Sequence, residues 1–204
     1  MKSLAGSFKE APLKKVSFNI DLYNSPVVTL RFRAQYSSIE RDVGMTTLSN
    51  TPLIRSATAD DAARIGAIAH AAFAKYVPRI GREPSPMVAD FDAEIAAHRI
   101  VVIETAGKVS GYMIAWPEAD AYLIDNIAVD SACQGEGLGR RLMEYAAAEA
   151  NRLRLRALRL YTNVLMIENL SMYAHLGFVE THRATTAKGF NVVYMRRSLP
   201  RDEQ

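Results

Sequence analysis

The chain has 204 residues, of which 49% are apolar and 23% are charged, which is typical of a soluble globular domain with one substantial core. Its single cysteine, Cys133, excludes an internal disulfide framework, and no apolar run approaches the roughly 18 residues of a membrane span. The formal net charge is +3, and the excess lies in residues 1–50, since the later residues carry 18 Lys and Arg against 18 Asp and Glu. These figures predict a reducing, cytoplasmic setting and disfavour nucleic acid or a membrane as partner.

Residues 1–50 form an N-terminal extension of uncertain order, ahead of a single domain over residues 51–200. The extension is rich in Ser, Lys and Arg, and its only alternating stretch is Val27–Arg33. Scattered acidic residues and the lack of a long apolar core disfavour a secretory or transit signal. Three interpretations stay open: a poorly ordered tail, an added strand, or a translated leader ahead of a start at Met45.

A regular pattern begins with a short strand at Leu53–Arg55. Thr58 and Asp61 have the spacing of a capping box and predict a helix, whose apolar face comprises Ile65, Ile68, Ala69, Ala72, Phe73 and Tyr76. A loop over Arg79–Pro84 and a second helix capped by Ser85 follow. The next apolar runs, 101–103 and 109–114, predict a hairpin around Gly107.

The most informative segment is Gln134–Gly139, because it lies between a predicted strand, Tyr122–Val129, and a predicted helix, Arg140–Arg152. Closely spaced glycines before a helix let several N–H groups point at one anion, so the segment predicts a pyrophosphate site. A P-loop is excluded because Gly139 is followed by two arginines instead of Lys and Ser or Thr. The glycine spacing also fits a dinucleotide-binding fingerprint poorly.

The remaining pattern is a strand near Leu158, a helix that carries Tyr173, and two strands near Phe178–Arg183 and Val192–Arg196. Helices near the start and a hairpin at the end favour an α/β sandwich with a mixed, largely antiparallel sheet.

Two motifs in this order resemble the GCN5-related N-acetyltransferase (GNAT) superfamily. The first is Q-x-x-G-x-G at Gln134–Gly139, and the second is the helix ending in Tyr173-x-x-Leu-Gly-Phe178. The resemblance implies a GNAT-like sandwich that transfers an acetyl group from acetyl-CoA to a primary amine by direct attack in a ternary complex, without a metal. It also allows a homodimer. A second class of function, a non-catalytic acyl-CoA-binding sensor, stays open.

The resemblance also implies which residues bind coenzyme A. The backbone of Ile127 and Val129 would bind the pantetheine arm, and the Val129 N–H would polarise the thioester carbonyl. The pyrophosphate would lie on the loop and the helix start, at Gln134, Gly135, Gly137, Leu138, Gly139 and Arg140. Asn169 is a further candidate contact, although the asparagine more usual in the family would fall at Met166.

Tyr173 is the candidate general acid for the departing thiolate, the alternative being an amphipathic core tyrosine. The resemblance also implies an acidic residue on the strand before the loop that relays the amine's proton through water, and Asp125 is the candidate. If Leu123, Ile127 and Val129 share one face of their strand, alternation places Asp125 on that face, the cleft side. The alternative for Asp125 is an ion pair with a basic neighbour.

Arg79 and Arg82 lie in the region that shapes the acceptor pocket in the family, where they could bind a carboxylate or phosphate of the acceptor. The alternative is a pair of solvated loop arginines. His70 and His98 are left out as bases, and the identity of the acceptor is not predicted.

Overall fold

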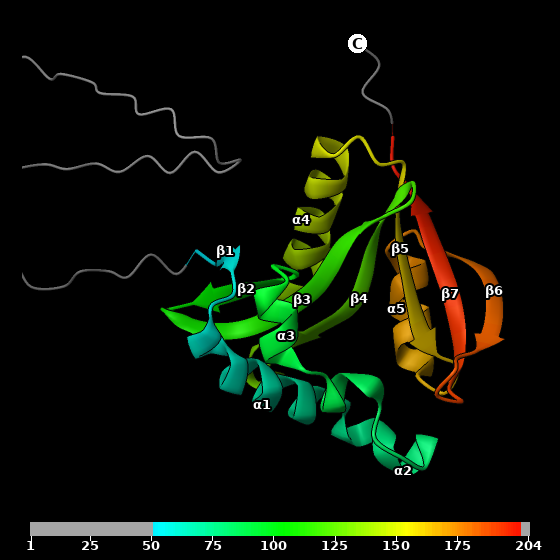
Figure 1. The fold of residues 1–204 in the computed structure, drawn as a ribbon, viewed down its shortest axis with the longest axis horizontal. Helices are drawn as coiled ribbons and strands as arrows, with labels where there is room; N and C mark the ends of the chain where they lie inside the picture. Colours follow the sequence, from blue (N-terminus) through cyan, green and yellow to red (C-terminus); the bar gives the residue numbers. More distant parts are fainter. Residues whose placement is uncertain (1–50, 201–204) are drawn as a thin grey trace, which may run out of the picture. The chain divides into compact units, whose positions relative to one another are not determined.

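The computed structural model describes residues 51–200, so the predicted N-terminal extension lies outside the described residues. Seven strands form one sheet in the order β1-β2-β3-β4-β5-β7-β6 (Figure 1). Only β4 and β5 pair in parallel, and every other neighbouring pair is antiparallel. The predicted mixed, largely antiparallel sheet is therefore confirmed. The strands are β1 Leu53–Ser56, β2 Ile100–Thr105, β3 Lys108–Glu118, β4 Ala121–Val129, β5 Ala157–Asn163, β6 Val179–Thr185 and β7 Asn191–Ser198.

The helices cover both faces of the sheet. They are α1 Ala62–Phe73, α2 Val77–Ile80, α3 Phe91–Ala96, α4 Leu138–Arg152 and α5 Ile167–His175, with 3-10 turns at Ala59–Asp61, Ala74–Tyr76, Ser85–Val88 and Ser131–Cys133. Side chains of α1 and α3 pack on one face of the sheet, whereas those of α4 and α5 pack on the opposite face. Alternation along β3 produces both cores, because Tyr112 and Ile114 face the first and Met113 faces the second.

The start of α1 forms as its sequence predicts. Thr58 and Asp61 make the capping box, with the Thr58 N–H donating to Asp61 at 2.8 Å. Asp61 also accepts two bonds from the Arg55 guanidinium, which reaches Glu104 on β2 as well. These charge-assisted bonds attach the helix start to the sheet edge.

The segment between α1 and β2 differs from the prediction. Ser85 is not the cap of a second long helix: a single 3-10 turn begins there with Pro84 at its N-cap. The helix α3 begins only at Phe91, where the Asp90 carboxylate accepts from the Ala93 N–H at 3.0 Å. Arg79 belongs to α2 and not to a loop. Two prolines within three residues keep the chain from one continuous helix.

Candidate active site

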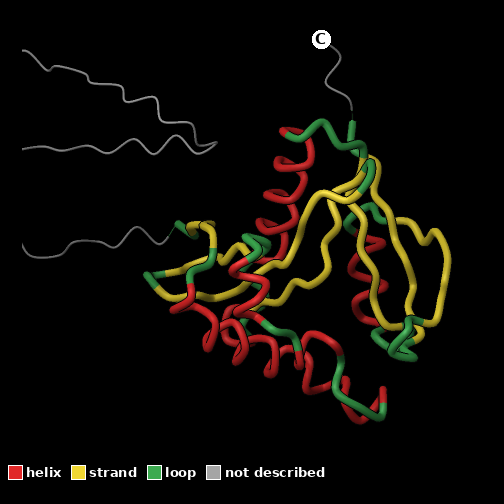
Figure 2. Tube along the Cα trace, in the orientation of Figure 1, coloured by secondary structure: helices red, strands yellow, loops and turns green. Residues whose placement is uncertain are grey.

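The sheet opens between β4 and β5. Their parallel pairing extends only from Ala121 with Ala157 to Ile124 with Leu160. Beyond that point β4 stays paired with β3, and β5 stays paired with β7. Figure 1 shows the two strands close together at one end and separated at the other, and Figure 2 shows the same opening in the trace. Residues 125–129 thus have a neighbouring strand on one side only.

Backbone groups of β4 point into this opening. The Asp130 N–H donates to Ser110 O at 2.8 Å, so the groups of residue 130 face β3. Because peptide groups alternate in direction along a strand, those of Ile127 and Val129 face the opposite side, which β5 has left. The Val129 carbonyl accepts from the Gln134 side-chain amide at 3.2 Å. The backbone of Ile127 and Val129 is therefore positioned to bind an extended ligand.

A β-bulge lies at Asp125. Ile114 pairs with Asn126 and Ala115 pairs with Ile124, so Asp125 has no partner on β3. The extra residue reverses the alternation: Ile124 faces the α4 side before the bulge, and Ile127 and Val129 face the same side after it. The prediction that Leu123 shares a face with Ile127 and Val129 is therefore wrong, because it assumed an unbroken period of two.

The glycine loop joins the end of β4 to α4. Gly135 and Gly137 have φ of 88° and 79°, and a Cβ on either would meet no atom within 4 Å. Gly137 is the N-cap of the 15-residue α4, and its carbonyl accepts from the Arg141 N–H at 3.1 Å. The N–H groups of the first helical turn, from Leu138 to Arg140, have no acceptor inside the helix. Open space, free N–H groups and a helix N-terminus together suit an anion.

The loop and the opening are adjacent. A Cβ on Gly139 would lie 3.8 Å from the Val129 side chain, so the first turn of α4 rests on the end of β4. Asp130 supports this junction, because its carboxylate accepts from the Ala132 N–H at 2.9 Å and pairs with Arg64 of α1. Leu138 itself is buried in the core, so only its backbone is available to a ligand.

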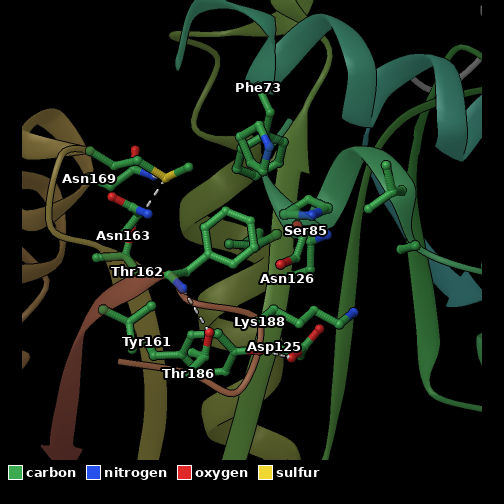
Figure 3. A pocket seen from close by; sticks show the side chains of 18 of the residues that line it. Phe73, Ser85, Asp125, Asn126, Tyr161, Thr162, Asn163, Asn169, Thr186 and Lys188 are labelled. Carbon is green, nitrogen blue, oxygen red and sulfur yellow. Dashed lines mark hydrogen bonds between the residues drawn. The ribbon is translucent and has the colours of Figure 1, made fainter. Parts of the chain in front are cut away.

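A pocket of about 590 Å³ lies in the opening (Figure 3). Four of the predicted site residues line it: Asp125, Ile127, Asn169 and Tyr173. Val129, the glycine loop, Arg79 and Arg82 do not. The other walls come from the segment Pro84–Asp90, the end of β5 and the β6–β7 hairpin.

Tyr173 is enclosed at the pocket wall. Its side chain is 6% exposed and packs edge-on to Phe178, with ring centroids 5.8 Å apart. Burial, followed by the neighbouring Tyr76, raises the pKa of the Tyr173 phenol above its ordinary value. The phenol therefore holds its proton throughout the neutral range, as a proton donor must.

Asp125 is held by a neighbour on the opposite strand. The Tyr161 hydroxyl donates a hydrogen bond to its carboxylate. Burial, together with the charge of Asp125, raises the pKa of Tyr161, so this phenol stays a donor. Asp125 makes no ion pair among residues 51–200, so the alternative of a basic neighbour finds no partner there.

Asn169 lies one helical turn before Tyr173 and already has partners. Its Oδ1 accepts from the Tyr76 hydroxyl at 3.1 Å, and its Nδ2 lies 3.6 Å from the sulfur of Met166. Met166, where the family more usually has asparagine, is buried in the α1-side core and lines the pocket. Asn169 therefore fixes the start of α5 against Tyr76.

Neither of the two predicted acceptor arginines lines the pocket. Arg79 forms a two-pronged ion pair with Glu168, both distances being 2.9 Å, and donates to Leu165 O. Arg82 lies over the Phe190 ring, 3.6 Å from its centroid. Their role toward an acceptor stays a prediction, and Arg79 would have to leave Glu168 to fulfil it.

Sequence reasoning missed Tyr161 and Lys188. Neither residue was among the predicted site residues. Both line the pocket. Tyr161 is the first residue of β5 beyond the end of its pairing with β4. Its place at the pocket depends on where that pairing ends, and the amino-acid composition of the two strands does not reveal this point.

Residues 96–180 match the family model of the acetyltransferase (GNAT) domain. This segment of the chain is similar to the GNAT acetyltransferase domain. This match spans β2 to the start of β6 and includes the opening, the glycine loop and Tyr173. The match supports the predicted activity of an acyl-CoA-dependent acetyltransferase.

Solved structures share the GNAT fold at low sequence identity. The ribosomal-protein-S18-alanine N-acetyltransferase from Escherichia coli is 22% identical, with a TM-score of 0.58 over 76% of this chain and 99% of that one. The PaiA N-acetyltransferase from Thermoplasma acidophilum, solved with coenzyme A, is 13% identical, with a TM-score of 0.61 over 73% and 99%. YncA from Salmonella typhimurium, solved with its cofactor acetyl-CoA, is 22% identical, with a TM-score of 0.55 over 76% and 97%.

Two other classes of site have no candidate among residues 51–200. No helix within residues 51–200 is both long and apolar enough to cross a membrane. In the same range, no three His, Cys, Asp or Glu side chains are grouped so that they could hold a metal ion.

Proposed function

We propose that this protein transfers an acetyl group from acetyl-CoA to a primary amine by direct attack in a ternary complex. One observation carries the proposal: the opening between β4 and β5 brings free backbone groups, a carboxylate and a protonated phenol to one pocket. The bound coenzyme A of the PaiA enzyme and the bound acetyl-CoA of YncA support the choice of co-substrate.

The residues of this chain fit coenzyme A. Gly135 and Gly137 leave open space beside a helix N-terminus, where the N–H groups of residues 138–140 would hold the pyrophosphate. The exposed Arg140 adds positive charge. Ile127 and Val129 would hold the pantetheine arm as an added strand, because their backbone groups have no strand on that side.

When bound, acetyl-CoA supplies a thioester that is already activated, so the protein has mainly to position and to stabilise charge. The Val129 N–H would donate to the thioester carbonyl. The negative charge that develops on the carbonyl oxygen would then be stabilised by the fixed Val129 N–H dipole in a partly closed site.

Tyr173 would give its proton to the thiolate that leaves. Its raised pKa keeps the phenol protonated at neutral pH, so the hydroxyl would be available to hydrogen-bond the sulfur and to give up its proton as negative charge develops there. Asp125 would accept the proton that the attacking amine releases, through a water molecule. The Tyr161 bond keeps the Asp125 carboxylate oriented toward the pocket that both residues line.

A free-thiol assay with acetyl-CoA and a broad panel of amines tests the proposal, with mass spectrometry of the product. We expect thiol release that depends on both substrates, and an N-acetylated amine. Tight acetyl-CoA binding without thiol release from any amine would contradict the proposal and favour the acyl-CoA sensor.

A further inference from the structure

The tip of the β6–β7 hairpin forms one wall of the pocket as a stiff turn. The Thr186 N–H donates to Phe190 O at 2.9 Å, and the Gly189 N–H donates to Thr186 O at 2.7 Å. The Phe190 N–H donates to the Thr186 hydroxyl at 3.1 Å, and Gly189 has a φ of 74° that suits glycine. Lys188, which lines the pocket, therefore projects from a turn of defined shape.

Arg82 contacts this turn and thereby connects it to the pocket wall formed by residues 84–90. Its guanidinium lies over the Phe190 ring at 3.6 Å, and a Cβ on Gly189 would lie 3.6 Å from its Nη2. Because Arg82 lies two residues before the Pro84–Asp90 wall, the contact joins the two sides of the pocket at its rim.

Some charged side chains of the pocket wall have a charged or backbone partner, and others do not. Asp90 caps α3, and Glu94 pairs with Arg99 at 3.4 Å. Asp125 accepts from the neutral Tyr161, so its charge stays uncompensated. Lys188 is the only Lys or Arg that lines the pocket, and it forms no ion pair within residues 51–200. Figure 3 labels Lys188 and Asp125 among the residues that line the pocket.

We infer that the acceptor is a small amino acid-like molecule whose amine meets Asp125 and whose carboxylate meets Lys188. This inference rests on the proposed acetyl transfer. One cation and one carboxylate that make no ion pair within residues 51–200 line the same cavity, and together they are complementary to a zwitterion. Lys188 is thus a specificity residue that touches the acceptor.

The anionic group is a carboxylate because of the surrounding charge. Three carboxylates line the pocket, Asp90, Glu94 and Asp125, so a doubly charged phosphate would be repelled more strongly than a singly charged group. Phosphate sites also favour the planar fork of arginine, whereas Lys188 offers a single point charge. The α-carboxyl of a protein N-terminus is consumed in a peptide bond, so such a terminus lacks the group that Lys188 would meet.

Matched pairs of acceptors test this inference. The kcat/KM for acetyl transfer is measured with amino acids and with the carboxamides of the same amino acids. We expect the native chain to favour the free acids by roughly tenfold or more, and K188M to reduce that preference to near unity by lowering the activity on the acids only. Lys188→Arg should retain most of the preference, and Lys108→Met, an exposed lysine at the β2–β3 turn, should leave it unchanged.

Equal activity on acids and carboxamides, or an equal loss on both in K188M, would overturn the inference while leaving amine acetylation intact. Absence of thiol release with every amine would instead refute the proposed function, and the inference with it. Because Lys188 is exposed, K188M should fold normally, and its thermal unfolding midpoint checks this.

Discussion

Tyr161 donates a hydrogen bond to Asp125 across the opening where β5 leaves β4. In continued parallel register these two residues would be neighbours in the ladder, one step beyond the pair of Ile124 with Leu160. A side-chain bond thus spans the place where backbone pairing ends. The bond from Tyr161 holds the Asp125 carboxylate where the opening begins. The β4 backbone beyond Asp125 has no strand paired with it on the β5 side.

This relationship predicts graded effects of two substitutions. Asp125→Asn should lower kcat by roughly 10²-fold, the usual scale for a lost proton acceptor. Tyr161→Phe should lower kcat less, by about tenfold at most, because the carboxylate stays but loses its orienting bond. Steady-state kinetics with a productive amine measure both, and Asp92→Asn, an exposed residue of α3, is the control. A larger loss in Tyr161→Phe than in Asp125→Asn would show that the carboxylate is not the proton acceptor.

The glycine loop predicts a specific loss of coenzyme A affinity. Gly137→Val places a branched side chain on a backbone with φ of 79°, at the point where N–H groups would meet the pyrophosphate. We expect the dissociation constant from calorimetric titration to rise roughly tenfold or more, which is about 1.4 kcal/mol. Gly107→Val is a matched control, because Gly107 has φ of 73° and equally open surroundings but lies at the β2–β3 turn. If both variants lose affinity equally, the loop is not the phosphate site.

The surroundings of Gly111 and Gly66 predict opposite effects of an alanine substitution on the free energy of unfolding. A Cβ on Gly111 would lie 2.9 Å from Ala128 O, so Gly111→Ala should push the strands apart and destabilise the fold by about 1–3 kcal/mol. Gly66→Ala in α1 meets only Phe91 at 3.8 Å and should stabilise by about 0.5–1 kcal/mol. Urea unfolding measures both, and a Gly111→Ala variant as stable as the native chain would contradict the contact.

The capping carboxylate of α1 predicts a dependence of stability on pH. The bonds from Arg55 lower the pKa of Asp61 from 3.8 to about 2. Since the folded pKa is depressed, the stabilisation is present above the ordinary pKa and is lost as pH falls from about 4 to about 2. Asp61→Asn should cost about 1–2 kcal/mol of unfolding free energy at pH 7, and less below pH 3. Exposed Asp60→Asn is the control, and a pH-independent difference would contradict the assignment.

Local signals predicted much of the fold and part of the site. The capping pair at Thr58 and Asp61, the hairpin at Gly107 and the positive φ at Gly137 follow from residue type and spacing, because each depends on only a few neighbouring residues. The second GNAT motif singled out Tyr173, and the family resemblance pointed to Asp125 on the strand before the loop; both residues line one pocket.

Long-range relationships could not be predicted. The bulge at Asp125 depends on the position at which the register between β4 and β3 shifts. The sequence around Asp125 does not reveal this position. Arg79 pairs with Glu168, which is 89 residues away in sequence, and the Arg82 guanidinium stacks on Phe190 of the last hairpin. The same is true of Lys188, because a turn residue acquires a pocket role only when the hairpin is placed across the opening.

The most direct test of the account separates chemistry from binding at Tyr173. Tyr173→Phe removes one hydroxyl and keeps the ring that packs on Phe178. We predict that kcat with a productive amine falls by roughly 10²-fold while the dissociation constant of acetyl-CoA changes little. Tyr122→Phe, a buried tyrosine that does not line the pocket, should change neither quantity. A Tyr173→Phe variant that keeps its full kcat while its acetyl-CoA affinity falls would make the tyrosine a binding residue and contradict its role as the general acid.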